Sequence, residues 1–357
     1  TASDSQVALE QSSAATTAFR LINSEGDGIS GLIVDVFNTT AVVHVSAAWL
    51  YGRAEVIARA LRSAYRGLSS SNKGDPVSEP ATRLLDRMVW APSADMLKLE
   101  GLQDVEQARA YRLDQLSPSM SGGGLQSCGL ADAEGTEVQE VVVEHGLRYQ
   151  VDPLRGQKTG FYCDQRLNRL WIRSIAHGKR VLDLCCYTGG FALNAASGGA
   201  ISVVAVDSSA GAIAVAKRNS ELNNLAEGTV DWHVNSIEKY MQQALDSGHQ
   251  RSFDIVVLDP PKLCPNHKML ERSLRKYRKL NMMAMQLVKE GGILLTHSCS
   301  GAVTQSGSLE LVVKQSAKAV SRRPVIVYHA GAAPCHVLNA SYPEGKYLTS
   351  LGVACLM

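Results

Sequence analysis

The chain has 357 residues, of which 45% are hydrophobic and 20% charged, and its formal net charge is +2 at pH 7. This length is sufficient for two domains, and the composition is typical of a globular protein. No apolar run approaches the roughly 20 residues that a membrane-spanning helix needs, so we expect no membrane partner. The nearly neutral charge neither requires nor excludes nucleic acid.

The eight cysteines form no CxxC pair and no zinc-type spacing, so we expect no metal site and reduced thiols. This predicts a reducing intracellular compartment, either the bacterial cytoplasm or an organelle matrix. The first residues, Thr1–Ser13, are polar and show no signal-peptide pattern. Because the chain does not begin with Met, we expect it to be trimmed or processed.

The N-terminal part alternates β-type and helical patterns. Residues 31–46 predict a hairpin turning at Asn-Thr-Thr, and residues 52–65 place apolar side chains at helical spacing. The Ser/Gly/Pro-rich stretch 67–81 predicts a loop, and residues 87–91 and 95–100 are strand candidates. Together they predict a small α+β domain of β-β-α-β-β type over residues 18–115.

A second pattern follows a Ser/Gly-rich stretch at 116–136, which predicts a flexible linker or insertion. The next domain, 137–357, opens with a hairpin that turns at His145-Gly146, and from residue 179 strands alternate with helices. This alternation predicts a parallel sheet covered by helices on both faces. The expected strands are 180–184, 202–206, 254–258 and 292–296, and the expected helices are 190–197, 209–222, 236–246 and 270–289.

The strongest local signal is the run 181–191, VLDLCCYTGGF, a buried strand that leads through Gly189 and Gly190 into a helix. In a doubly wound sheet, ligands bind beyond the carboxyl ends of the strands, at turns of this kind. Glycines let the backbone approach the ligand, and the helix N-terminus offers unpaired N–H groups. A purely structural strand-to-helix turn is the alternative.

Asp207 ends the next strand, where a carboxylate can accept hydrogen bonds from both hydroxyls of a ribose. Because the sequence lacks GxGxxG, an adenosine with an amino-acid tail fits better than a dinucleotide. The alternative for Asp207 is a helix N-cap.

Residues 259–262, Asp-Pro-Pro-Lys, follow the strand 254–258, and two consecutive prolines impose a rigid turn. Asp/Asn-Pro-Pro after this strand marks methyltransferases that act on planar nitrogen bases or amides; a plain loop is the alternative. Cys299 follows the strand 292–296, and its thiolate could attack C6 of a pyrimidine. Such a thiolate needs a base or a positive field, for which His297, Lys262 and a bound sulfonium are candidates. An inert buried thiol is the alternative.

From residue 18 to the end the chain resembles the bacterial-type 23S rRNA 5-methylcytosine methyltransferase family, in which a PUA domain and a central domain precede a Rossmann-like catalytic domain. Residues 5–19 are similar to the end of the linker that follows the PUA domain, so we expect 1–17 to be residual linker and the PUA domain to be missing. The matching motifs, in family order, are EGDGISGLIVDVF (25–37), SADMLKLEGL (93–102), GQKTGFYCDQRLNR (156–169), VLDLCCYTGGFALNAASGGA (181–200), LDPPK (258–262), THSCS (296–300) and YPEGKYL (342–348).

The resemblance implies a Rossmann-like methyltransferase domain with a mostly parallel, seven-stranded sheet that uses S-adenosyl-L-methionine. By the same resemblance Cys299 is the nucleophile and Asp259 binds the cytosine at N3 and its exocyclic amine. Asn235 stands where the family usually carries Asp beside the adenine. Cys264 does not match the release cysteine of other RNA cytosine methyltransferases. The implied cofactor contacts are Phe161, Gln165 and Arg166 in a closing segment, Asp183, Tyr187 and Gly189 on the methionine side, Asp207 at the ribose, and Asn235 and Asp259.

The segment 262–279 is strongly basic, with Glu271 as its acidic residue, and it begins beside the Asp-Pro-Pro turn. It predicts a path for RNA phosphates, with Pro260, Pro261, Lys262, Arg275 and Lys276 as RNA contacts; a solvated helix face is the alternative. We therefore expect RNA, most of all rRNA, as the partner, and a homodimer is compatible with the sequence. Two rivals stay open: methylation of a base nitrogen without a covalent step, and an inactive RNA-binding assembly factor.

Overall fold

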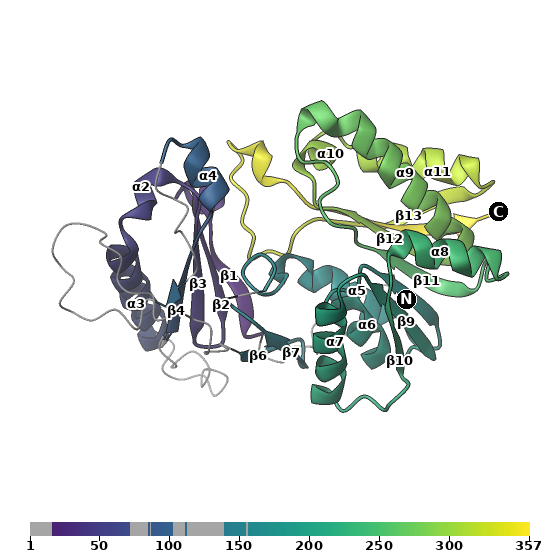
Figure 1. Ribbon diagram of the computed structural model, residues 1–357, viewed down its shortest axis with the longest axis horizontal. Helices are drawn as coiled ribbons and strands as arrows, with labels where there is room; N and C mark the ends of the chain where they lie inside the picture. Colours follow the sequence, from purple (N-terminus) through teal and green to yellow (C-terminus); the bar gives the residue numbers. More distant parts are fainter. Residues whose placement is uncertain (1–15, 72–84, 86, 103–110, 113–138, 155) are drawn as a thin grey trace. The chain divides into compact units, whose positions relative to one another are not determined.

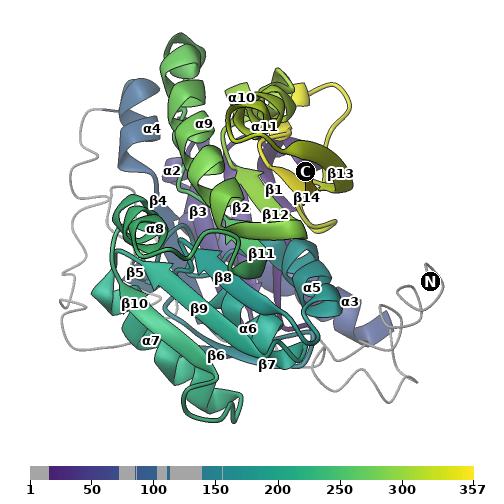
Figure 2. The same cartoon turned by 90° about the vertical axis from the view of Figure 1, so that its right-hand side faces the viewer.

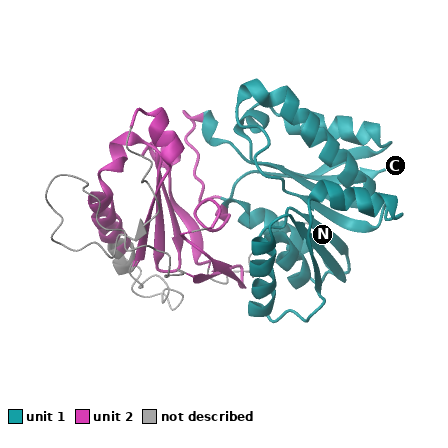
Figure 3. Ribbon diagram, in the orientation of Figure 1, with its two compact units in different colours: residues 1–12, 164–333, 343–357 teal, residues 13–163, 334–342 magenta. Residues whose placement is uncertain are grey.

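The computed structural model describes residues 16–71, 85, 87–102, 111–112, 139–154 and 156–357 (Figure 1). The expected linker at 116–136, residues 1–15 and the 72–81 part of the expected loop lie outside the described residues. Contacts divide the chain into two units (Figure 3): unit 1 holds Asp164–Ala333 and Pro343–Met357, and unit 2 holds the described residues up to Cys163 together with Pro334–Tyr342.

Unit 2 is built on a five-stranded sheet of order β1-β2-β3-β4-β5. The predicted hairpin 31–46 is confirmed as the antiparallel pair β2 and β3, with Asn38 in the left-handed region at the turn, and β4 adds to β3 in parallel. Buried valines of β2 and β3 pack with Leu61 of α3 and Trp90 of β4 in one apolar core. The strands are β1 (Ala18–Asn23), β2 (Leu32–Phe37), β3 (Thr40–Val45), β4 (Arg87–Pro92) and β5 (Tyr111–Arg112), and the helices are η1 (Ser24–Asp27), α2 (Ala48–Tyr51), α3 (Ala54–Ser71) and α4 (Ala94–Leu99).

Two expectations for this region are wrong. The strand candidate 95–100 is helix α4, since Ala, Met, Leu and Lys are strong helix formers and the segment lacks β-branched residues. Its apolar residues do not share one buried face: Leu97 is buried, whereas Leu99 is 81% exposed. The expected loop at 67–81 begins too early, because α3 continues to Ser71.

The predicted hairpin that turns at His145-Gly146 is confirmed as β6 (Glu140–Glu144) and β7 (Leu147–Val151). Its contacts belong to unit 2: Thr40 Oγ1 donates to Glu140 Oε1 over 2.6 Å, and Thr17 N donates to Val143 O over 2.8 Å. The contacts thus divide the chain after Cys163. The hairpin therefore belongs to unit 2, whereas the sequence grouped it with the domain 137–357.

Unit 1 contains a seven-stranded sheet of order β10-β9-β8-β11-β12-β14-β13 (Figure 2). The strands from β10 to β12 are parallel, and β14 runs antiparallel to both of its neighbours. All four predicted strands and all four predicted helices of this region are present, with ends that differ by a few residues. The strands are β8 (Arg180–Leu184), β9 (Ser202–Asp207), β10 (Val230–Val234), β11 (Phe253–Leu258), β12 (Val288–Ser298), β13 (Arg323–Ala330) and β14 (Thr349–Leu356).

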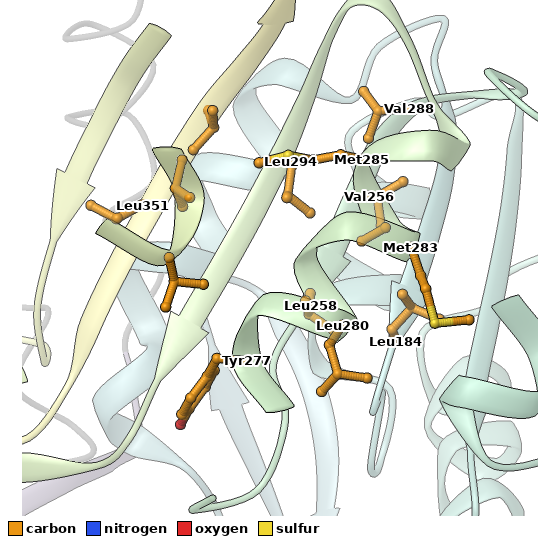
Figure 4. Packing of buried hydrophobic residues seen from close by; sticks show 14 of the residues in the cluster. Leu184, Val256, Leu258, Tyr277, Leu280, Met283, Met285, Val288, Leu294 and Leu351 are labelled. Carbon is orange, nitrogen blue, oxygen red and sulfur yellow. The ribbon is translucent and has the colours of Figure 1, made fainter. Parts of the chain in front are cut away.

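Alternate residues of the central strands pack into two separate apolar layers, as period-2 side-chain geometry requires. Leu182, Leu184 and Leu258 join the layer with α8, α9 and α11, and Figure 4 shows part of this packing around Tyr277 and Leu280 of α9. Val181 joins the opposite layer, with α5, α6 and α7. The helices of unit 1 are η5 (Cys163–Gln165, which spans the division), α5 (Arg166–Ile175), α6 (Gly190–Ser197), α7 (Ala210–Leu222), α8 (Ile237–Asp246), η6 (His267–Met269), α9 (Leu270–Leu287), α10 (Gly301–Gln305), α11 (Ser308–Ala319) and η7 (Pro343–Gly345).

Candidate active site

The carboxyl ends of four parallel strands are level with one another in unit 1. Leu184 of β8 pairs in register with Val206 of β9 and with Leu258 of β11, and Leu258 pairs with Thr296 of β12. The segments that follow these strands therefore meet at one edge of the sheet. They carry the glycine turn, Asp259 and Cys299, and Asp207 is the last residue of β9 at the same edge.

The turn after β8 is tight. Cys185 and Tyr187 have φ values of 66° and 49°, and Gly189, the N-cap of α6, has φ 87°. A Cβ on Gly189 would lie 2.8 Å from the Trp232 ring, so this position requires glycine for both its conformation and its packing. The turn leaves the first N–H groups of α6 at the sheet edge.

Asp183 is fully buried just before this turn, and its Oδ2 accepts the Ala192 N–H over 2.9 Å. Among the described residues its Oδ1 has no hydrogen-bond partner. Burial, reinforced by the nearby charges of Asp259 and Asp207, raises the pKa of Asp183 to about 8 against the opposing effect of the Ala192 bond. A buried carboxyl oxygen without a partner at this edge suits a ligand that brings a hydrogen-bond donor.

Asp207 is held by two backbone N–H groups: Tyr187 N donates to Oδ2 over 2.9 Å and Ser209 N donates to Oδ1 over 2.8 Å. The N-cap alternative for Asp207 is wrong, because Ser209 caps α7 by accepting the Ala212 N–H. Each carboxylate oxygen keeps a further acceptor site. Asn235 donates its backbone N–H to Asp207 O and its side-chain amide to Gln243.

The Asp259 carboxylate is bound by Gln165, whose Nε2 donates to Oδ2 over 3.0 Å. Asn168 Nδ2 in turn donates to Gln165 Oε1 over 2.6 Å and to Ser350 Oγ over 2.9 Å. Ser350 Oγ lies 2.7 Å from His297 Nδ1. All of these partners are buried, so Asp259 is positioned by a buried polar network that spacing in the sequence did not predict.

The Cys299 thiol lies at the Asp-Pro-Pro turn: its Sγ is 3.9 Å from Pro260 O, and the residue is partly exposed. Asp259 and Cys299, predicted to converge, therefore follow adjacent strands and lie on touching segments. Burial lowers the pKa of His297 to about 3, so its imidazole carries no positive charge and is only a weak base, and it does not suit either predicted role beside this thiol. Cys264 is buried.

The other predicted site residues fall in four places. Phe161 belongs to unit 2, where it packs against Tyr149 with ring centroids 5.1 Å apart; its cofactor contact stays a prediction. Arg166 begins α5, beside Gln165. Pro260 is buried, whereas the four remaining predicted RNA contacts are exposed: Pro261 and Lys262 in the turn and Arg275 and Lys276 on α9.

The strand order with its antiparallel β13–β14 edge, the glycine turn after β8 and the acids at the carboxyl ends of β9 and β11 define a class I, Rossmann-like methyltransferase fold. Two solved methyltransferase structures share it: SMU.776 complexed with SAH, with TM-score 0.71, 20% identity and coverage of 99% of this chain and 79% of that one, and a SAM-dependent methyltransferase from Streptococcus mutans, with TM-score 0.72, 19% identity and coverage of 98% and 79%.

Residues 120–322 match the family described as S-adenosylmethionine-dependent methyltransferase. Two curated relatives carry the name ribosomal RNA large subunit methyltransferase I. The one from Shewanella denitrificans is 32% identical over 94% of this chain and 74% of its own length, and the one from Escherichia coli O157:H7 is 34% identical over 95% and 74%. The chain belongs to the S-adenosylmethionine-dependent methyltransferase family that includes these relatives.

The cofactor is S-adenosylmethionine, and the residues at the sheet edge fit it. The unpartnered Oδ1 of Asp183 can accept from the ammonium group of the methionine part, and the remaining acceptor sites of Asp207 can take the ribose hydroxyls. Within the described part of the chain, no cluster of three or more His, Cys, Asp or Glu could hold a metal ion. Each described helix is too short or too polar to cross a bilayer.

Proposed function

We propose that the protein methylates C5 of a cytosine in large-subunit rRNA through a covalent bond between Cys299 and C6 of the base. The relatives named ribosomal RNA large subunit methyltransferase I support rRNA as the substrate. The observation that carries the cytosine-C5 chemistry is the partly exposed Cys299 thiol, whose Sγ lies 3.9 Å from the backbone O of Pro260, the residue that follows Asp259.

The chemistry needs both residues. The Cys299 thiolate forms a bond to C6, which makes C5 nucleophilic, while Asp259 holds the N3 and exocyclic amine edge of the cytosine. S-adenosylmethionine supplies a methyl group bonded to a positively charged sulfur. Once C5 is methylated, a base takes the proton from C5 and the Cys299–C6 bond breaks, which restores the ring and the thiolate. A paired cytosine must leave its duplex to reach the thiol.

Cofactor contacts are part of the proposal. Asp183, Tyr187 and Gly189 line the methionine side, Asp207 binds the ribose and Asn235 lies at the adenine. Gln165, the N-cap of α5, and Arg166, its first residue, complete the proposed set in unit 1. The contact of Phe161 with the cofactor is kept as a prediction. In this arrangement Gln165 also contacts Asp259, so it links the cofactor side of the site to the base side.

Trapping tests the mechanism. We expect the wild type and S-adenosylmethionine to form a denaturation-resistant complex with large-subunit rRNA that contains 5-fluorocytidine, since fluorine on C5 cannot leave as a proton does. Cys299→Ser should form none, whereas Cys264→Ser should still form it. If the wild type forms no adduct and Cys299→Ser still transfers the methyl group, methylation of a base nitrogen is favoured instead. If the wild type transfers no methyl group at all, an inactive RNA-binding factor is favoured. Bisulfite mapping of rRNA from cells with and without the gene should locate the methyl group.

A further inference from the structure

Cys299 lies between two serines that share one hydrogen-bond partner, the hydroxyl of Tyr277 on α9. Ser298 Oγ donates to Tyr277 Oη over 3.0 Å, and Tyr277 Oη lies 3.2 Å from Ser300 Oγ. Ser300 N donates back to Ser298 Oγ over 3.3 Å. Because Ser298 supplies the proton to Tyr277, the Tyr277 hydrogen is available for Ser300, and the three bonds close a ring around the segment that carries the thiol.

The same helix is also hydrogen-bonded to the segment that follows Asp259. Ser273 Oγ, four residues before Tyr277 and so on the same face of α9, donates to Leu263 O over 2.8 Å. Ser300 Oγ accepts the Cys264 N–H over 3.2 Å, which joins the two segments directly. One buried face of α9 therefore sets where both segments lie.

The Tyr277 hydroxyl is not needed to fill space. Tyr277 is fully buried in the apolar layer with Leu280 and Leu258 (Figure 4), and a phenylalanine ring would occupy nearly the same volume. Burying a hydroxyl costs free energy unless it is hydrogen-bonded. The side chains that bond to this hydroxyl are the two serines that flank Cys299. Burial also raises the pKa of Tyr277, so the phenol stays a neutral donor.

We propose that Tyr277 is a positioning residue for the methyl-transfer reaction: its hydroxyl holds Ser298 and Ser300 so that the Cys299 thiol stays against the Asp259-Pro260 turn. This inference rests on the proposed function, since it assigns Tyr277 a role through Cys299. A thiol that is free to drift by about 1 Å from its attack geometry can lose roughly 100-fold in rate.

Tyr277→Phe tests the proposal because it removes only the hydroxyl. We expect kcat and the rate of adduct formation with 5-fluorocytidine-containing rRNA to fall by about 10- to 100-fold, while the Kd for S-adenosylmethionine stays within about twofold. Tyr240→Phe is the matched control: Tyr240 is half-buried on α8 and its ring contacts His233 of β10. This control should keep wild-type kcat.

A double-mutant cycle separates positioning from a general loss of structure. If the ring of bonds acts as a unit, Tyr277→Phe combined with Ser300→Ala should be little slower than the slower single variant. Rates are normalised to the folded fraction from thermal unfolding. Wild-type kcat in Tyr277→Phe, or losses that simply add in the double variant, would overturn the inference while leaving the proposed function intact. Absence of a wild-type adduct would overturn the proposed function and this inference together.

Discussion

Gln165 and Asp259 are joined by a hydrogen bond of 3.0 Å from Nε2 to Oδ2. The orientation of the Gln165 amide is determined, because Asn168 donates to its Oε1 and is itself oriented by the Tyr328 hydroxyl, which donates to Asn168 Oδ1 over 2.8 Å. This bond fixes the orientation of the Asp259 carboxylate, which is proposed to hold the substrate base.

Gln165→Met should therefore lower turnover at saturating cofactor by about 10-fold, since it keeps the volume but removes the donor to Asp259. The affinity for S-adenosylmethionine should change less than turnover does. Gln286→Met, at an exposed position on α9, serves as the control. Steady-state kinetics with calorimetric cofactor binding make the comparison; a weakened cofactor affinity with unchanged turnover would assign Gln165 to the cofactor alone.

Asp183 should make the protein less stable as the pH rises. Its pKa, about 8 in the fold, lies above the unfolded value, so the folded state binds more protons between about pH 4 and pH 8 and stability falls across this range. Asp183→Asn abolishes this titration. Urea unfolding without cofactor measures the free energy of unfolding of both proteins. Relative to the wild type, that of the variant should increase by up to about 1.4 kcal/mol for each unit that the pH rises. If the stability of Asp183→Asn ran parallel to that of the wild type over this pH range, the assignment would be wrong. The control is Asp246→Asn at an exposed position, whose pH profile should run parallel to that of the wild type.

His297 should give stability the opposite dependence on pH. Its folded pKa of about 3 lies below the unfolded value, so the unfolded state binds more protons at intermediate pH and stability falls as the pH drops below about 6.5. Between pH 7 and pH 5 the wild type should lose about 2 kcal/mol that His297→Gln does not lose. Urea midpoints at both pH values measure the difference. The exposed His249→Gln should behave like the wild type, and an equal loss in His297→Gln would refute the prediction.

Much of unit 1 could be predicted because its short, apolar strands and the helices between them follow simple periodicity, and the strand ends then locate Asp207, Asp259 and Cys299 at one edge. The strand predicted at 95–100 failed because three apolar residues interspersed with polar ones in a six-residue segment do not distinguish a strand from the short helix α4. Contacts such as Gln165–Asp259 and Tyr277–Ser298 could not be predicted. They depend on which side chains tertiary packing brings together, and polar residues in a helix pattern carry no signal of their partner.

Gly189 offers a paired test of the cofactor turn. Both Gly189→Ala and Gly228→Ala place a side chain at positive φ, at a cost of roughly 1–2 kcal/mol. At Gly228 the added Cβ meets nothing within 4 Å, whereas at Gly189 it would lie 2.8 Å from the Trp232 ring. Gly189→Ala should therefore be the less stable variant in thermal unfolding and should bind S-adenosylmethionine at least about 10-fold more weakly. Equal stability and affinity in the two variants would show that the close packing is unimportant.

The basic side chains of α9 should supply phosphate contacts if RNA is the substrate. Arg275 and Lys276 are exposed, and Lys276 lies close enough to the glycine turn for its charge to oppose the raised pKa of Cys185, which results mainly from burial and from nearby carboxylates. Replacing Arg275 and Lys276 together by Gln should weaken rRNA binding and reduce the slope of log K against log salt by about 2, roughly one for each phosphate that is no longer neutralised.

The matched control for this pair is Lys314→Gln with Lys318→Gln, which removes two exposed charges from α11. If α9 is only a solvated helix face, both double variants should change the slope of log K against log salt by the same small amount, because each removes the same net charge. A phosphate path predicts a reduced slope for the α9 pair alone, with cofactor affinity unchanged. Filter binding over a range of salt concentrations decides between them. Removing a side chain that touches a phosphate changes the number of counterions released on binding, whereas a distant charge is screened beyond about 10 Å at 0.1 M salt.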